Sequence, residues 1–396
     1  MMWLVKPALL WLSARLMANC KVFVMQFIDL KAQFEVLEPA IKRRIDRVLA
    51  DGLFILGPEV AEFEALLATY CGTPHAIGCA NGTDALVLAL RSLDIGPGDA
   101  VLTTPFSFFA TVEAIMLVGA RPVFADIDMR TFNIDAAKVA DRIEAHDSGR
   151  DGKLKAVISV DLFGLPADYD RLEPLCAHHG LALIEDAAQG FGGAIGNRRA
   201  GSFGTIATTS FFPAKPLGCY GDGGALLTND ARLADRLRSL RMHGKGQHKY
   251  DNVEVGYNSR LDTLQAAILI EKLAAFPAEL KARQDVAKRY QESLEEVVSV
   301  PSVPATMTSS WAQYSLLAAD GRHRHHLVAA LESAGIPHAM YYGRALHLQP
   351  ALASLGGREG DFPVAEDVSS RIFSVPMGPY LRAEDQDRVI AALRAT

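Results

Sequence analysis

The chain has 396 residues, of which 49% are hydrophobic, and its formal net charge is −6. This size and composition predict a globular protein with two or three domains, or with one large domain and a smaller one. The charges are spread along the chain without a basic run, which argues against a nucleic-acid partner. The five cysteines show no CxxC and no Cys/His spacing suited to a metal. The sequence therefore predicts no disulfide framework and no metal site, and it favours a reducing cytoplasm.

Residues 1–24 are apolar enough to raise the question of an export signal or a membrane segment. Pro7 and Arg15 interrupt the apolar run, and no convincing small-residue cleavage site follows it. We therefore expect an N-terminal extension that need not belong to the native fold, ahead of a natural beginning at Met25.

From residue 76 onward, short apolar runs alternate with helical patterns. The runs "AIGCA", "AVLTT", "RPVFADID", "KAVISVDLFG" and "LALIEDAA" are separated by amphipathic segments, one of them expected as a helix near 135–146. This alternation predicts βαβ units around a sheet that is buried on both faces. Ligands of such sheets gather at the carboxyl ends of the strands. The polar residues at these ends are Asn81, Gly82, Thr83, Asp161, Asp186 and Gln189.

The pattern changes after Asn258. Long helices are expected at "SRLDTLQAAILIEKLAAF" and "AELKARQDVAKRYQESLEEV", followed by the Pro- and Ser-containing stretch "VPSVPATMTSS". The change divides the chain into a large domain at 25–270 and a small C-terminal domain at 271–396.

An Asn-Gly-Thr turn follows the first of these strands and opens a helix. Gly82 lets the backbone approach a ligand closely, and the free amides of the first helical turn favour an anion. The motif is neither a GxGxxG dinucleotide loop nor a Walker loop. Gly82 and Thr83 are therefore candidates for holding a phosphate. The alternative is an ordinary strand-to-helix turn with Thr83 as the N-cap.

The strand "LALIED" ends in two carboxylates, Glu185 and Asp186. A nearly buried acid is costly unless a cation or hydrogen-bond donors meet it, so a positive group is expected to face one of them. Alternation along the strand places Asp186 on one face and Glu185 on the other, so only one acid can point into a given site. The alternative is a structural N-cap or a salt bridge to Arg198.

Lys215 lies in "SFFPAKPLGCYGDGG", between two prolines and among apolar residues and glycines. Apolar packing lowers the pKa of a lysine, and the prolines fix the backbone. These conditions suit a nucleophilic amine that forms a Schiff base. Ser210, just upstream, could share a phosphate with the Asn-Gly-Thr turn. A phosphate turn, an acid for a pyridinium nitrogen and a desolvated lysine are the groups that pyridoxal phosphate (PLP) requires.

Four blocks of the sequence, in order, resemble the DegT/DnrJ/EryC1/StrS family of sugar aminotransferases, a branch of the fold type I PLP enzymes. They are "GTDALVLAL", "EDAAQGFGG", "TSFFPAKPLGCYGDGGALLTND" and "VGYNSRLDTLQAAIL", and the likeness runs from about residue 25 to the C-terminus. The resemblance implies an α/β large domain with a mixed, mostly parallel sheet and a smaller C-terminal α+β domain. The likeness is greatest to WbpE/WlbC-like members, which aminate a UDP-linked 2-acetamido-2-deoxy-3-keto-hexuronic acid with glutamate as the amino donor.

The resemblance also implies which residues bind PLP. Lys215 would form the Schiff base, and Asp186 would pair with the pyridinium nitrogen. Phe108 would stack on the ring, and Gln189 would lie beside its phenolic oxygen. The phosphate would be held by Gly82, Thr83 and Ser210.

Further residues are implied at the substrate side of the site. Asn258 would reach the phosphate of the partner subunit's cofactor, which implies a homodimer with shared active sites. Arg260 is the candidate clamp for a substrate carboxylate, because a guanidinium fork binds carboxylate bidentately. The family often has His-Tyr-Pro where this chain has Tyr341-Tyr342-Gly343, a departure that bears on the substrate rather than on the cofactor. Tyr342 and His347 are the other substrate-binding candidates, although a lone histidine is more often structural.

The predicted function is transfer of an amino group from glutamate to a nucleotide-linked keto-sugar, namely the UDP-linked uronic acid, in polysaccharide or lipopolysaccharide sugar biosynthesis. The alternatives are a dTDP- or other NDP-linked 3-keto or 4-keto deoxy-sugar as substrate, or a non-catalytic regulator with the same fold. A sugar dehydratase would carry histidine in place of Lys215, and a regulator would have lost the acid or the lysine. An NAD enzyme would need a glycine fingerprint that this sequence does not contain.

Overall fold

The structure is a computed structural model that describes residues 25–248 and 250–396. The expectation for residues 1–24 lies outside the described residues. Among the residues that are described, no helix has the length and apolar character needed to cross a membrane.

The large sheet has seven strands in the order β1-β9-β8-β5-β4-β2-β3. The five strands from β8 to β3 are parallel to one another; β9 pairs antiparallel with β8, and the edge strand β1 pairs antiparallel with β9 and so runs in the direction of the five. The strands are β1 His75–Cys79, β2 Asp99–Thr103, β3 Arg121–Phe124, β4 Lys153–Val160, β5 Ala182–Asp186, β8 Ile206–Ser210 and β9 Gly224–Thr228. This arrangement confirms the predicted mixed, mostly parallel sheet.

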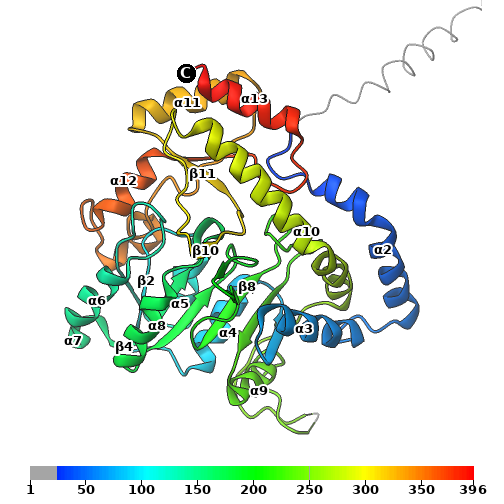
Figure 1. Cartoon of the computed structure of the whole chain (residues 1–396). Helices are drawn as coiled ribbons and strands as arrows, with labels where there is room; N and C mark the ends of the chain where they lie inside the picture. Colours follow the sequence, from blue (N-terminus) through cyan, green and yellow to red (C-terminus); the bar gives the residue numbers. More distant parts are fainter. Residues whose placement is uncertain (1–24, 249) are drawn as a thin grey trace, which may run out of the picture.

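Helices cover both faces of this sheet (Figure 1). Helices α4, α5 and α9 pack on the face that carries Ile158 and Ile184, whereas α3, α10, α6 and α8 cover the face that carries Val157 and Leu183. Successive strand residues therefore enter opposite cores, which is why these strands read as continuous apolar runs. The helices are α2 Leu30–Asp51, α3 Pro58–Cys71, α4 Gly82–Ser92, α5 Ala110–Leu117, α6 Ala136–Glu144, α7 Ser148–Asp151, α8 Tyr169–His178 and α9 Ala231–Leu240, with a 3₁₀ turn η1 at Leu162–Gly164.

A second core lies in the C-terminal part of the chain. It is built around the antiparallel pair β11–β12 and the helices α11 and α13, and Met25 from the start of the described chain also packs into it. A three-stranded sheet, β10-β6-β7, joins β10, which precedes β11, to two short strands that lie between β5 and β8 in the sequence. The elements are β6 Ala194–Ile195, β7 Arg198–Arg199, β10 Met307–Thr308, β11 Tyr314–Leu317, α11 Gly321–Ser333, η2 Leu346–Leu348, η3 Pro350–Leu355, α12 Pro363–Arg371, β12 Ile372–Val375 and α13 Ala383–Arg394.

The two long helices expected after Asn258 are one continuous helix, α10, Thr263–Leu294, which contains Pro277. A proline inside a helix removes one hydrogen bond and crowds the carbonyl four residues before it, yet α10 packs along α2 and α3 and reaches α13 (Figure 1). Tertiary packing therefore outweighs the helix-breaking preference of Pro277. The predicted domain boundary at residue 270 falls inside α10, and the division into two domains stays a prediction.

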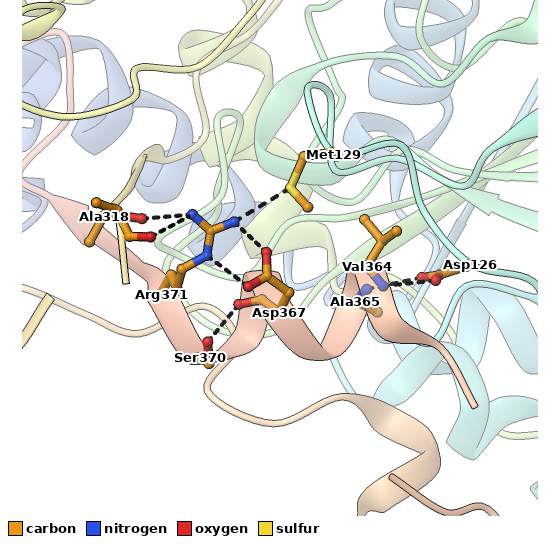
Figure 2. Close-up of polar contacts among 9 residues, drawn as sticks. Asp126, Met129, Ala318, Val364, Ala365, Asp367, Ser370 and Arg371 are labelled. Atoms are coloured by element: carbon orange, nitrogen blue, oxygen red, sulfur yellow. Dashed lines mark hydrogen bonds and ion pairs between the residues drawn. The ribbon is translucent and has the colours of Figure 1, made fainter. Parts of the chain in front are cut away.

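Side-chain contacts fix both ends of α12, its start to the segment that follows β3 of the large sheet and its end to the segment that follows β11 (Figure 2). Asp126, just past β3, accepts hydrogen bonds from the backbone N–H groups of Val364 (2.9 Å) and Ala365 (3.0 Å) at the start of α12. At the other end of α12, Arg371 donates to Asp367 and to the Ala318 carbonyl (2.9 Å). Because a carboxylate satisfies the free amides of a helix N-terminus, Asp126 fixes where α12 begins relative to the sheet.

Candidate active site

Lys215 lies in the loop that follows β8, at the carboxyl edge of the large sheet. The residue is half-buried, and its own N–H donates to the Phe212 carbonyl (2.8 Å). Among the described residues, no hydrogen-bond acceptor meets its amine. Burial lowers the pKa of Lys215, and attraction to Asp186 opposes this shift. The uncharged amine, which is the nucleophilic form, is therefore easier to reach than in a lysine exposed to solvent.

Asp186 ends β5 and is buried, with 5% of its surface exposed. Its oxygens accept hydrogen bonds from the Thr111 hydroxyl (3.1 Å) and the Ala188 N–H (3.2 Å). Burial raises its pKa, whereas these bonds and the attraction to Lys215 act in the opposite direction. The expected positive group facing one of the two acids is thus Lys215.

Glu185 points to the other face of β5, as strand alternation predicts. It accepts hydrogen bonds from the backbone N–H groups of Gly201 (2.7 Å) and Phe203 (2.8 Å). Arg198, the alternative partner considered for the two acids, instead pairs with Glu173 at 2.7 Å.

The Asn-Gly-Thr turn opens α4, and its N-cap is Asn81, whose side chain accepts from the Asp84 N–H (2.8 Å). The alternative with Thr83 as the N-cap is therefore wrong. A Cβ on Gly82 would lie 2.6 Å from the Cβ of Ser210, so only glycine fits at this position. The structure brings the first turn of α4 together with Ser210, as expected for a shared phosphate site.

Gln189 and Phe108 both contact Tyr342. The Gln189 side chain donates to the Tyr342 hydroxyl (3.2 Å) and accepts from the Phe163 N–H (2.8 Å). The Phe108 ring is 55% exposed and lies 6.4 Å from the Tyr342 ring. Burial raises the pKa of Tyr342, so this hydroxyl stays protonated and can donate a hydrogen bond.

Asn258 and Arg260 lie together at the start of the segment that leads into α10. Arg260 donates to the Asn258 side chain, and the Ser259 hydroxyl between them accepts from the Ala80 N–H (3.1 Å) next to the phosphate turn. No acidic side chain in residues 25–248 or 250–396 pairs with Arg260. Its guanidinium is half-buried and keeps donors for an incoming anion.

His347 is placed differently. Its side chain is 1% exposed, its Nε2 lies 3.0 Å from Glu366 of α12, and its ring packs edge-on against Phe362. Its Nδ1 is buried without a hydrogen-bond partner among the described residues. The structure does not join His347 to the other predicted site residues by any contact of its ring.

Two residues near the site are not identified by the sequence reasoning. Thr111 bonds Asp186, but one threonine in a helical pattern gives no signal. Lys272 of α10 is 1% exposed, donates to the Gly218 carbonyl (2.5 Å) in the loop after Lys215, and lies over the Tyr220 ring. Burial lowers the pKa of Lys272 to about 8. A lysine within the apolar run "AILIEKLAAF" was the available signal.

Comparison with known proteins gives one matching family model, described as the DegT/DnrJ/EryC1/StrS aminotransferase family, over residues 36–394. The chain belongs to the DegT/DnrJ/EryC1/StrS aminotransferase family. A UDP-2-acetamido-2-deoxy-3-oxo-D-glucuronate aminotransferase of Pseudomonas aeruginosa is 42% identical over 93% of this chain and 99% of its own. A UDP-N-acetyl-3-dehydro-alpha-D-glucosamine 3-aminotransferase of Acidithiobacillus ferrooxidans is 40% identical, over 93% and 97% of the two chains.

Solved structures agree with this family assignment. The crystal structure of a DegT DnrJ EryC1 StrS aminotransferase from Brucella abortus has a TM-score of 0.91 at 50% identity, and covers 94% of this chain and 99% of its own. The structure of ntda from Bacillus subtilis, with bound cofactor PMP, has a TM-score of 0.86 at 28% identity, over 95% and 86% of the two chains. The comparisons confirm the predicted family, the fold type I architecture, the aminotransferase class and the PLP cofactor.

The residues of this site fit PLP. The site offers a half-buried amine with a lowered pKa, an opposed carboxylate, and a helix N-terminus whose glycine is packed too tightly for a Cβ. The Phe108 ring, which is largely exposed and lies next to the Tyr342 ring, suits stacking on an aromatic cofactor. This chain therefore has the groups that suit the PLP cofactor of the DegT-family aminotransferases.

Proposed function

We propose that this enzyme transfers an amino group from glutamate to a UDP-linked 2-acetamido-2-deoxy-3-keto-hexuronic acid. The observation that carries the proposal is the opposition of Lys215 and Asp186 at the carboxyl edge of the sheet. PLP, when bound, supplies an electron sink for the pair left by the broken C–H bond. Production of a polysaccharide or lipopolysaccharide sugar and a cytoplasmic location are parts of the same proposal.

In this proposal, Lys215 would hold the cofactor, and its amine would act as the base that takes the proton from the α carbon of the donor. The lowered pKa of Lys215 favours the uncharged form that this task needs. Asp186, whose ionised form the Thr111 and Ala188 donors stabilise against the burial that raises its pKa, would face the pyridine nitrogen.

The remaining cofactor-binding roles follow the positions of the side chains. We assign the phosphate to Gly82, Thr83 and Ser210, because the first turn of α4 offers free amides. Phe108 would stack on the ring, and Gln189 would lie beside the phenolic oxygen. Asn258 would contribute to the phosphate of the partner's site.

On the substrate side, Arg260 would bind the sugar carboxylate. Its half-buried guanidinium has no acidic partner in the described chain, so a carboxylate ligand would complete the pair. Tyr342 and His347 remain the further candidates. Tyr342 meets Gln189 and Phe108, whereas the burial of His347 against Glu366 supports a positioning role for that ring.

The second candidate substrate is the neutral 3-keto sugar, because a relative named for such a sugar is nearly as similar to this chain as the uronate enzyme. The test compares both UDP-linked sugars with glutamate and measures the 2-oxo acid that is formed. We expect the uronate to be favoured by at least about a hundredfold in kcat/KM, since a neutral ligand leaves a guanidinium unpaired. Arg260→Ala should erase most of this preference, and Arg91→Ala, at the far end of α4, should keep it. Equal rates on the two sugars would contradict the uronate assignment.

We also propose that the enzyme is a homodimer with shared active sites. Large apolar side chains are exposed around the site, including Leu53 (56%), Ile55 (50%) and Phe212 (52%), as expected for a surface that a second subunit covers. Mixing inactive Lys215→Ala and Arg260→Ala chains should restore some activity through heterodimers. Heterodimers without activity would place both groups in the site of one subunit.

A further inference from the structure

Three carboxyl groups lie close together in the interior behind the site. Asp161 follows β4 directly, Glu185 and Asp186 end β5, and the Asp161 N–H donates to the Asp186 carbonyl (3.0 Å). Asp161 and Glu185 have no exposed surface, and Asp186 has 5%. Three carboxylates so near one another in a dry interior cannot all be ionised.

One oxygen of the three carboxyl groups differs from the others because it has no hydrogen-bond donor among the described residues. Both oxygens of Glu185 accept a backbone N–H, and both oxygens of Asp186 accept a hydrogen bond. Oδ1 of Asp161 accepts from the Ala167 N–H (3.0 Å) and the Tyr169 hydroxyl (2.8 Å). Oδ2 of Asp161 is buried and has no donor among the described residues.

We propose that Asp161 is a neutral carboxylic acid that carries its proton on Oδ2, is directed at Glu185, and keeps the negative charge of the cluster on Asp186 and Glu185. An ionised acid needs donors at both oxygens, whereas a protonated oxygen does not. The role of Asp161 is to position charge. The inference depends on the proposed function only where it takes Asp186 as the partner of the pyridine nitrogen.

The surroundings of Asp161 support the neutral state. Burial is the main cause that raises its pKa, to about 7; its hydrogen bonds with Ala167, Tyr169 and Glu185 act in the opposite direction, and the charge of Asp186 raises it. Glu185 and Tyr169 also face it, and burial raises the pKa of both of these groups. The nearest cations lie beyond the acids: Lys215 faces Asp186, and Arg198 attracts Glu185 while pairing with Glu173. Of the two acids, we assign the proton to Asp161 because two backbone amides stabilise the charge of Glu185.

A neutral Asp161 has a consequence for the site. If Asp161 were ionised, its repulsion would raise the pKa of Asp186 and weaken the carboxylate that must hold a protonated ring nitrogen. There is also no room to move the acid away, since a Cβ on Gly190 would lie 2.3 Å from the Cβ of Asp161. Because Asp161 cannot move away from Asp186, the protonation of Asp161 is what prevents repulsion between the two groups.

The direct test is infrared spectroscopy of the full chain as purified, because a protonated carboxyl group has a carbonyl stretch apart from that of carboxylates. We expect such a band at neutral pH, and we expect Asp161→Asn to remove it. Glu185→Gln should shift the band without removing it. Loss of the band in Glu185→Gln and its persistence in Asp161→Asn would overturn the assignment, as would absence of the band from the unmutated enzyme.

Thermal unfolding gives a second readout that does not depend on turnover. The folded-state pKa of Asp161 is raised, so its contribution to stability is present at low pH and is lost as pH rises from about 4 through about 7. Asp161→Asn should therefore raise Tm at pH 8, and the gain should shrink towards pH 4. Glu185→Gln should lower Tm at every pH, because its new N–H₂ group would face a backbone N–H.

The matched control is Asp151→Asn, the same substitution at another buried aspartate. Arg150, Arg142 and Arg121 surround Asp151, and hydrogen bonding to Arg150 is the main cause that holds its pKa at about 2. Asp151→Asn should lower Tm at pH 8, which is the opposite sign from Asp161→Asn. A gain at neither residue, or an equal loss at both, would contradict the neutral Asp161. Neither result would bear on the Schiff base at Lys215.

Discussion

A buried aspartate lies at each end of strand β4, and the two aspartates have opposite surroundings. Before the strand, Asp151 is 4% exposed and lies within ion-pair distance of three arginines, the nearest at 2.8 Å. After the strand, Asp161 is fully buried beside two further acids, and no arginine in the described chain pairs with it. The amino edge of the sheet pairs its charges, which serves stability. At the carboxyl edge, acids lie together without an arginine partner among the described residues, as at a site that a ligand completes.

The largest effect that sharpens this comparison is expected at Asp186. Asp186→Asn should bind PLP but lower turnover by roughly a hundredfold or more, about 3 kcal/mol of barrier, because an amide cannot hold the protonated ring nitrogen. Asp141→Asn, at a 71% exposed side chain, is the control and should not change turnover. Steady-state rates with bound PLP checked by absorbance measure both variants. Turnover near that of the unmutated enzyme would make Asp186 a structural acid.

A smaller effect is expected at the paired end of the strand. Asp151→Asn should lower the free energy of unfolding by about 1–2 kcal/mol at neutral pH. The loss is limited to this range because the arginines are partly exposed and solvent screens their charges. Because its pKa is lowered, the contribution of Asp151 is present above about pH 4 and is lost as pH falls towards about 2. Denaturant unfolding at several pH values measures this loss. A loss of stability that does not depend on pH would contradict the difference that we assign to the aspartates at the two ends of β4.

The smallest effect concerns Asp126, an acid at the carboxyl edge with a structural task. Asp126→Ala should destabilise the protein by about 1 kcal/mol, because two N–H groups at the start of α12 lose their acceptor. Thermal unfolding should show a lower Tm, and the visible absorbance of bound PLP should be unchanged. Loss of that absorbance would show that the hydrogen bonds to Asp126 in Figure 2 also support the cofactor site.

Much of the fold follows from local pattern in the sequence. The order of strands and helices, the position of the polar strand ends and the opposite directions of Glu185 and Asp186 are all consequences of periodicity. The continuity of α10 through Pro277 could not be predicted, because it depends on packing against α2 and α3.

The site was predictable to a smaller extent. Lys215, Asp186 and the Asn81–Gly82 turn are recognisable from their neighbours in the sequence. The donors that set their charges come from distant segments: Thr111 for Asp186, and the amides of Gly201 and Phe203 for Glu185. Hydrogen bonds between distant segments leave no periodic signal, so the difference between Asp151 and Asp161 becomes visible only in three dimensions.

The central claim is that the half-buried amine of Lys215 is the group that bonds to PLP. The most direct measurement is reduction of the purified enzyme with borohydride, followed by peptide mapping. The account predicts a visible absorption band that disappears on reduction and a stable cofactor adduct on Lys215, with Lys272 unmodified. An adduct on another lysine, or a reduced enzyme in which Lys215 carries no adduct, would contradict the claim.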